Sequence, residues 1–166
     1  MQNVNNRTGR RADPDYILSE CQAIMAEVEN YEAAYQRSDE KARRLNDAEN
    51  LETATSAIMA EQATLTKEVK LIGQRMLRVK QHPDSAQARN QRQVSVTDRR
   101  VQKLLDAANI SAKVLREERG KIVARDYRRV HPEATDSEVR EASEDMQFSN
   151  VYSQAVSPDL LPGWAY

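Results

Sequence analysis

The chain has little of what β-rich and nucleotide-binding folds require. Its 166 residues include four glycines and five prolines, and aromatic residues make up only 5%. Sandwiches and barrels depend on turn glycines and on aromatic residues in their strands, and phosphate-binding loops depend on clustered glycines. These shortages argue against both classes and favour an all-α fold.

Cysteine, histidine and long apolar runs are also scarce. Cys21 is the single cysteine, which excludes a disulfide within the chain, and two histidines are too few for an ordinary zinc site. No apolar run approaches the roughly 20 residues that span a bilayer, and the N-terminus has no signal-peptide core. We therefore expect no cofactor, no metal ion and no direct insertion into a membrane.

Neither sign of charge dominates the composition. Lysine and arginine number 25 and aspartate and glutamate 26, which gives a formal net charge of −1. Proteins that bind nucleic acid usually carry a marked basic excess, because their affinity comes largely from displacing counterions from phosphates. We therefore expect no nucleic-acid partner.

The chain does have three series of apolar residues, spaced alternately by four and three positions. This spacing is typical of long helices that pack lengthwise against one another. It predicts three long helices, at about 14–46, 51–81 and 92–130. Six residues of the series are expected to be buried together in the core: Ile24, Val28, Ile58, Leu65, Leu105 and Leu115.

Turn signals separate the three predicted helices. Proline disfavours the α conformation in the residue before it, so His82-Pro83 and His131-Pro132 are predicted to end the second and third helices. The first apolar series slips out of register near Asn46, where we expect a turn over 46–50. Helices joined by short loops run antiparallel, so the sequence favours an antiparallel up-down-up three-helix bundle over 13–131.

The segments on either side of this bundle differ from it. The N-terminal residues are rich in Asn and Arg without an apolar period, which predicts disorder. After the third helix, Thr135 and Glu138 form a capping-box sequence that opens a short helix. The expected segments are a tail over 1–12, a linker over 132–156 that contains a short helix over 136–146, and an irregular end over 157–166.

No arrangement of residues points to catalysis. The sequence contains no nucleophile elbow, no HExxH motif and no phosphate-binding loop. Cys21 falls on the first apolar series, so we expect a buried and inert thiol. His82 and His131 are expected to cap helix ends or to lie exposed. We therefore expect that the protein is not an enzyme and that its function lies in its surfaces.

Four short segments in the second half of the chain are more specific than helical periodicity. They are Gln102–Leu105, Arg125–Arg129, Pro132–Val139 (PEATDSEV) and Asn150–Ala155. Together they resemble exocytic syntaxins, most closely the fungal plasma-membrane kind, and the PEATDSEV stretch is the most specific of them. The resemblance covers roughly residues 14–156.

The resemblance implies the N-terminal Habc regulatory domain of a t-SNARE. In that family the bundle folds back on the SNARE helix of the same chain, which lies in the groove between the second and third helices. This closed state blocks assembly with partner SNAREs. The implied partners are the SNARE helix in cis, other SNAREs, tethering factors and an SM-family protein. The implied role is vesicle fusion on the cytoplasmic side of the plasma membrane, with this fragment itself soluble in the cytoplasm.

Two candidate interaction sites follow. Four apolar residues that lie off the core series are predicted to line a groove for a partner helix: Met59, Leu77, Leu104 and Val114. The resemblance also implies a latch after the third helix that holds the closed state. The positions that best match this latch are Val139 and Arg140, with Phe148, Val151 and Tyr152 following in the linker.

Two other functional classes remain open at this point. Residues 157–166 do not match the syntaxin family, whose members continue into a SNARE helix and a membrane anchor. A stand-alone helical scaffold or adaptor could bind an unrelated partner helix. An oligomeric coiled coil is the other class, since heptads also suit helices from separate chains. The turn signals at 46–50 and 82–93 favour an intramolecular bundle.

Overall fold

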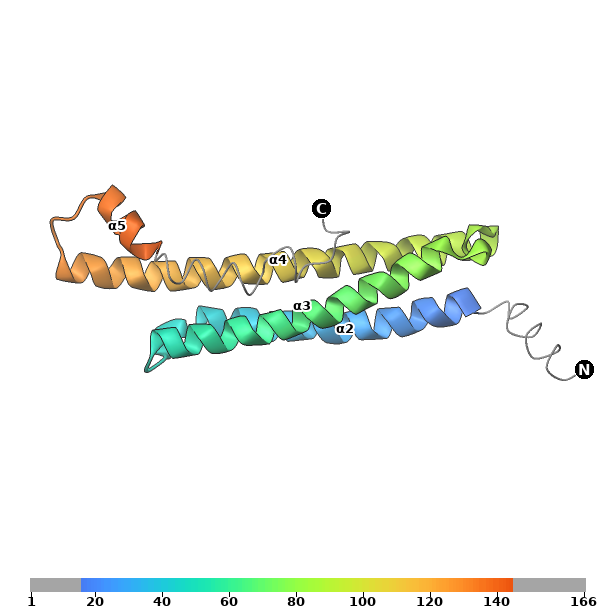
Figure 1. Cartoon of the computed structure of the whole chain (residues 1–166), viewed down its shortest axis with the longest axis horizontal. Coiled ribbons are helices and arrows are strands. Elements are labelled where there is room, and N and C mark those ends of the chain that lie inside the picture. The colour runs from blue at the N-terminus through green and yellow to red at the C-terminus, as the bar shows by residue number, and fades with distance from the viewer. Residues whose placement is uncertain (1–15, 145–166) are drawn as a thin grey trace, which may run out of the picture.

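A computed structural model describes residues 16–144, and all regular secondary structure in that range is helical. The elements are α2 (Tyr16–Arg43), the short 3-10 helix η1 (Leu45–Asp47), α3 (Leu51–Gln81), the 3-10 helix η2 (Pro83–Ala86), α4 (Ala88–Val130) and α5 (Asp136–Ser143). The four α-helices pack together: α2, α3 and α4 contact one another, and α5 contacts α4. Figure 1 shows the three long helices lying lengthwise, with α5 folded back over one end of α4.

The observed helix bounds differ from the expected ones mainly at the turns. Helix α3 spans the 51–81 range expected for the second helix, whereas α2 ends at Arg43 and α4 begins at Ala88 instead of 92. Leu45 remains buried although it lies in η1, so the apolar series continues past the end of the α-helix. Asn50 caps α3 by accepting a hydrogen bond from the Thr53 amide at 2.9 Å.

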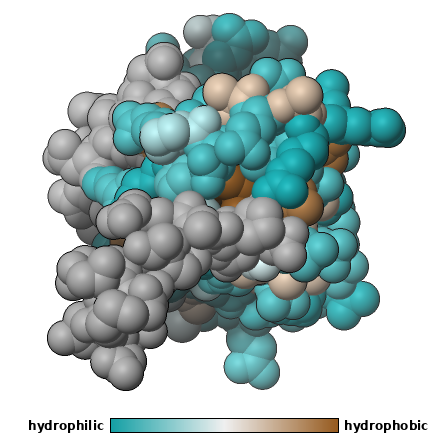
Figure 2. Space-filling view, turned by 90° about the vertical axis from the view of Figure 1, so that its right-hand side faces the viewer, coloured by the Kyte–Doolittle hydropathy of each residue, from teal (hydrophilic) through white to brown (hydrophobic). Residues whose placement is uncertain are grey.

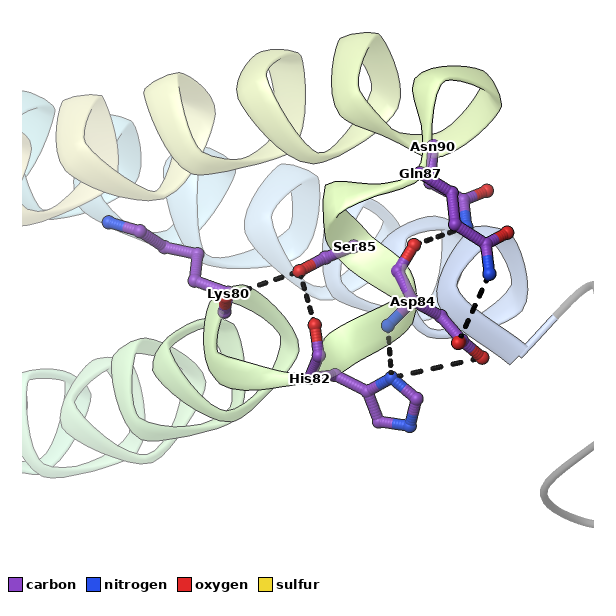
Figure 3. Close-up of polar contacts among 6 residues, drawn as sticks. All are labelled: Lys80, His82, Asp84, Ser85, Gln87 and Asn90. Atoms are coloured by element: carbon purple, nitrogen blue, oxygen red, sulfur yellow. Dashed lines mark hydrogen bonds and ion pairs between the residues drawn. The ribbon is translucent and has the colours of Figure 1, made fainter.

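A network of side-chain hydrogen bonds explains the turn between α3 and α4 and the early start of α4 (Figure 3). The Asp84 amide donates to His82 Nδ1 at 3.1 Å, so this histidine caps the start of η2 as expected from its place before proline. Ser85 Oγ donates to the His82 carbonyl at 2.7 Å, and Asn90 Nδ2 donates to the Asp84 carbonyl at 2.8 Å. These bonds satisfy backbone groups that a helix end leaves unpaired.

The core consists of two apolar clusters. The larger cluster joins α2, α3 and α4 and includes Ile24, Val28, Ile72 and Leu105. The smaller cluster contains Ala42, Leu45, Ile58, Met59 and Leu115. Five of the six predicted core residues are therefore buried, but they belong to two clusters and not to one.

A buried polar layer separates these two clusters. Gln62 of α3 is 2% exposed, and its Nε2 donates to Ser38 Oγ of α2 and to the Ser111 carbonyl of α4, both at 3.1 Å. One side chain thereby connects the three long helices. Because an unpaired amide in a core costs free energy, this layer favours the one register in which all three residues meet.

The sixth predicted core residue, Leu65, is only partly buried, because Thr66 occupies the core position next to it. Spacings of four and three both lead from Gln62 to Val69, so the apolar pattern favoured Leu65. In the structure the Thr66 hydroxyl donates to the Gln62 carbonyl at 2.8 Å and lies 3.4 Å from the Tyr35 hydroxyl. A satisfied hydroxyl can be buried at this position.

Charged pairs mark the three seams between the long helices. Lys41 of α2 pairs with Glu61 of α3 at 2.8 Å, Glu32 of α2 pairs with Arg100 of α4 at 2.7 Å, and Lys80 of α3 pairs with Asp98 of α4 at 3.2 Å. Exposed pairs of this kind contribute only about 0–1 kcal/mol each. They are useful here because they identify which face of each helix borders which neighbour.

Candidate partner surface and helical latch

The predicted groove for a partner helix is not an open row of apolar side chains. Met59 and Leu104 are buried in the two core clusters, at 3% and 0% exposed. Val114 is partly buried against the smaller cluster. Leu77 alone of the four presents half of its surface to solvent. The groove prediction is therefore wrong for Met59 and Leu104, which belong to the core and cannot contact a partner.

Helical phase explains the error on α4. Arg100 faces α2, where it pairs with Glu32. Residues seven positions apart lie on nearly the same helix face, so Ala107 and Val114 follow Arg100 toward the α2 side of α4. Val114 also packs against the smaller cluster, which includes residues of α3. The sequence-based prediction assigned Val114 to the groove between the second and third helices, because a phase error of one residue over a long helix changes the seam that a position faces.

The surface at one end of the molecule is largely hydrophilic. In the end-on view of Figure 2 most of the coloured surface is hydrophilic, and the most hydrophobic atoms show mainly between hydrophilic side chains. Five large apolar residues in the described range are exposed: Tyr16, Leu71, Leu77, Ile110 and Val130. Singly scattered apolar residues are normal on soluble surfaces.

The segment expected to be a latch begins with a capped helix. The Glu138 amide donates to Thr135 Oγ1 at 3.2 Å, and the Thr135 amide donates to Glu138 Oε1 at 3.2 Å, which completes the capping box that the sequence predicted. Hydrogen bonds from the Thr135 amide and hydroxyl lower the pKa of Glu138. The charged form of Glu138 therefore stabilises the start of α5.

One buried side chain and one ion pair hold α5 against the bundle. Val139 is 3% exposed and is the only buried residue of α5, and α5 contacts α4. Arg128 near the end of α4 pairs with Asp136 at the start of α5, with 3.1 Å between Nη2 and Oδ1. A helix of eight residues is marginal by itself, so its persistence depends on this docking.

Of the remaining latch positions, only Arg140 lies within the residues that the structure describes. Arg140 is exposed whereas Val139 is buried, so Val139 is the docking residue of the pair. Phe148, Val151 and Tyr152 lie outside the described residues.

Sequence analysis missed a groove of about 600 Å³ between α2 and α4. Tyr35 and Asp39 line it from α2, and Arg100, Ala107 and Ile110 line it from α4. The Oδ1 atom of Asp39 is buried and has no hydrogen-bond partner among the described residues. The sequence did contain one sign of this groove. Ile110 is an apolar residue outside the third series, and it lies on about the same face of the helix as Ala107.

Two buried titratable groups are structural. Burial raises the pKa of the Cys21 thiol, which keeps it protonated and unreactive, as expected from its place on the apolar series. Burial raises the pKa of Tyr35 to about 12, and its hydroxyl lies beside Thr66. Neither group is poised for proton transfer near neutral pH.

Residues 16–144 lack the features of a metal site and of a membrane span. No three His, Cys, Asp or Glu side chains of this range gather closely enough to hold a metal ion. No helix of this range combines the length and the hydropathy required to cross a bilayer.

A comparison with known proteins found no matching family model, no matching curated protein and no matching solved structure.

Proposed function

We propose that this chain is the N-terminal regulatory domain of a syntaxin-type t-SNARE. In this proposal α2, α3 and α4 form an antiparallel up-down-up three-helix bundle of the Habc type, and α5 begins the linker. The domain inhibits assembly by binding the SNARE helix of its own protein, and it binds SM-family and tethering factors at the plasma membrane.

A single observation carries the proposal: the PEATDSEV segment supplies the cap and the first turn of a helix that docks directly after the third long helix. Its threonine and glutamate make the capping box, and its final valine, Val139, is buried. A linker without a role in the bundle needs neither feature. A short helix whose stability depends on one buried residue suits a latch that can open.

The energetics suit a reversible switch. Val139 contributes about 1.5–3 kcal/mol when fully buried, and the exposed Arg128–Asp136 pair adds little. A two-state element with a gap of a few kcal/mol keeps its minor state populated at about 0.1–10%. A partner that prefers the released state of α5 can therefore shift the equilibrium without unfolding the core.

Binding of a SNARE helix tests this proposal directly. The probe is a fluorescently labelled peptide with the SNARE motif of a plasma-membrane syntaxin, titrated with the 166-residue chain and followed by fluorescence anisotropy. We expect saturable binding with one peptide per chain. A peptide of the same composition in scrambled order is the control. Equal binding of the two peptides, or no binding of either, would reject the proposal.

The charged seams favour a single chain over an oligomeric coiled coil. Each of the three seams between the long helices carries an ion pair between helices of the same chain. An oligomer would need a further apolar face, whereas the large exposed apolar residues of the described range are few. Sedimentation equilibrium is therefore expected to give the monomer mass of 18.9 kDa, and a stable dimer mass would favour the coiled coil.

A further inference from the structure

We propose that residues 147–155 of this chain bind in the groove between α2 and α4. The groove is the one lined by Tyr35 and Asp39 of α2 and by Arg100, Ala107 and Ile110 of α4. This inference rests on the geometry of α5 and of the groove, and it does not depend on the proposed function.

Helix α5 directs the chain toward this groove. Arg128 of α4 pairs with Asp136 at the start of α5, so this face of α4 borders α5. Figure 1 shows α5 slanting back over α4, away from the end at which α4 stops. Ile110 precedes Arg128 by 18 residues, which is five full turns of an α-helix. The two residues therefore lie on the same face of α4, and a chain that kept the direction of α5 would run along that face toward Ile110.

The lengths agree with this path. Eighteen residues of α4 between Ile110 and Arg128 span about 27 Å, and the eight residues of α5 cover about 12 Å of that distance. The remaining 15 Å or so needs about five extended residues at roughly 3.3 Å each. Counting from Glu144, the last described residue, the chain up to Phe148 is long enough to reach the level of Ile110, and the residues after Phe148 are long enough to enter the groove.

The segment and the groove are chemically complementary. Residues 147–155 carry no charged side chain, and Phe148, Val151 and Tyr152 have the i, i+3, i+4 spacing of one helix face. Ile110 is 56% exposed and offers an apolar contact at the rim of the groove. Asp39 lines the groove, and its Oδ1 atom has no hydrogen-bond partner among residues 16–144, so it can accept from a further donor. The Tyr152 hydroxyl is a donor of the right class.

Hydrogen exchange on the full 166-residue chain tests the docking. We expect amides of 147–155 to exchange at least tenfold more slowly than those of an unstructured peptide of the same sequence. Ile110→Glu is expected to abolish this protection. The matched control is Val130→Glu, on the same helix and 70% exposed outside the groove, which should preserve it.

A second variant controls for distortion of α4 by the glutamate introduced in Ile110→Glu. Phe148→Ser changes the segment and leaves the bundle sequence intact, and it should shift the methyl resonances of Ile110 but not those of buried Ile24. Absence of protection in the parent chain would overturn the inference. Protection that survives Ile110→Glu would also overturn it, since the segment would then dock elsewhere. Protection that rises with protein concentration would assign the groove to a second copy of the chain and would overturn it as well.

Discussion

At the scale of residues, the glutamine at position 62 has the most distinctive role in the core. Its amide reaches Ser38 of α2 and the Ser111 carbonyl of α4, and it separates two apolar clusters. An apolar residue of similar size would fill the space but would not distinguish one register from another. Polar core positions that fix register are known from coiled coils, and Gln62 fits that role here.

Gln62→Ala should lower the free energy of unfolding by about 2–4 kcal/mol, because it removes two hydrogen bonds and leaves a cavity. Gln74→Ala is the matched control, since Gln74 is an exposed glutamine of the same helix, and it should change stability by less than about 0.5 kcal/mol. Urea denaturation gives both values. Similar losses of unfolding free energy in the two variants would contradict the structural role given to the polar layer.

Ile72→Ala should cost about 2–5 kcal/mol through lost transfer free energy and an unfilled cavity. Ile72 is 2% exposed in the larger cluster, whereas its neighbour Leu71 is 53% exposed. Leu71→Ala should therefore have almost no effect on the midpoint of denaturation. A reversed order of the two effects would show that the face of α3 assigned to the core is wrong.

Much of the core could be predicted from the sequence, but its exact members could not. Periodicity correctly identified Ile24, Val28, Ile58, Leu105 and Leu115 as buried. It failed where two spacings are equivalent, at Leu65 beside Thr66. It also failed for Met59 and Leu104, because an apolar residue next to the main series widens the buried stripe of a helix that has two neighbours.

At the scale of elements, α4 is a helix of 43 residues that contains a glycine at position 120. A Cβ atom built at Gly120 meets nothing within 4 Å. The backbone there is helical, so alanine can replace glycine without strain. The glycine therefore weakens α4 without a compensating contact in the described structure.

Gly120→Ala should raise the free energy of unfolding by about 0.5–1 kcal/mol, because glycine in a helix interior has a larger entropic cost than alanine. Thermal denaturation followed by circular dichroism measures the change. A loss of stability would show that the glycine meets a close neighbour after all.

The capping box of α5 should depend on pH. Hydrogen bonds from Thr135 lower the pKa of Glu138 below its ordinary value of 4.5. The charged carboxylate therefore stabilises α5 above about pH 4.5, and this contribution is lost as the pH falls through the lowered pKa. Amide exchange of α5 should accelerate over that range relative to exchange of the long helices.

Glu138→Gln separates this effect from general acid unfolding. A glutamine can still accept from the Thr135 amide, but it does not titrate, so the variant should lose the pH dependence of α5 and keep the helix. The same acid response in parent and variant would assign the titration to another group.

The ends of the elements were less predictable than their centres. The capping box gave the start of α5 and the prolines gave the ends of α3 and α4, because these signals act on the local backbone. The start of α4 at Ala88 depends on Asn90 and Ser85, which bond to backbone groups across the turn. Such contacts arise only after the chain has reversed, so sequence spacing does not reveal them.

At the scale of the whole molecule, the arrangement combines a stable core with one weakly held element. The three long helices share two apolar clusters and a polar layer, whereas α5 depends on Val139 and on an exposed ion pair. The sequence predicted a short capped helix after Pro132. It could not show that Val139 alone of the two latch residues is buried, because docking depends on the face that α4 presents.

Release of α5 should therefore change function more than stability. Val139→Ala removes about two buried carbon atoms, at about 0.8 kcal/mol each, and every 1.4 kcal/mol changes a population about tenfold. The released state should become about tenfold more populated while the melting temperature of the bundle stays nearly constant. Arg140→Ala, at the exposed neighbouring position, should alter neither.

The rate of SNARE assembly tests the central claim most directly. The chain would be joined to the SNARE helix of a plasma-membrane syntaxin, and its assembly with partner SNAREs would be followed in the parent, in Val139→Ala and in Arg140→Ala. The account predicts assembly about tenfold faster in Val139→Ala, in proportion to the released population, and an unchanged rate in Arg140→Ala. Equal rates in the parent and Val139→Ala would contradict it.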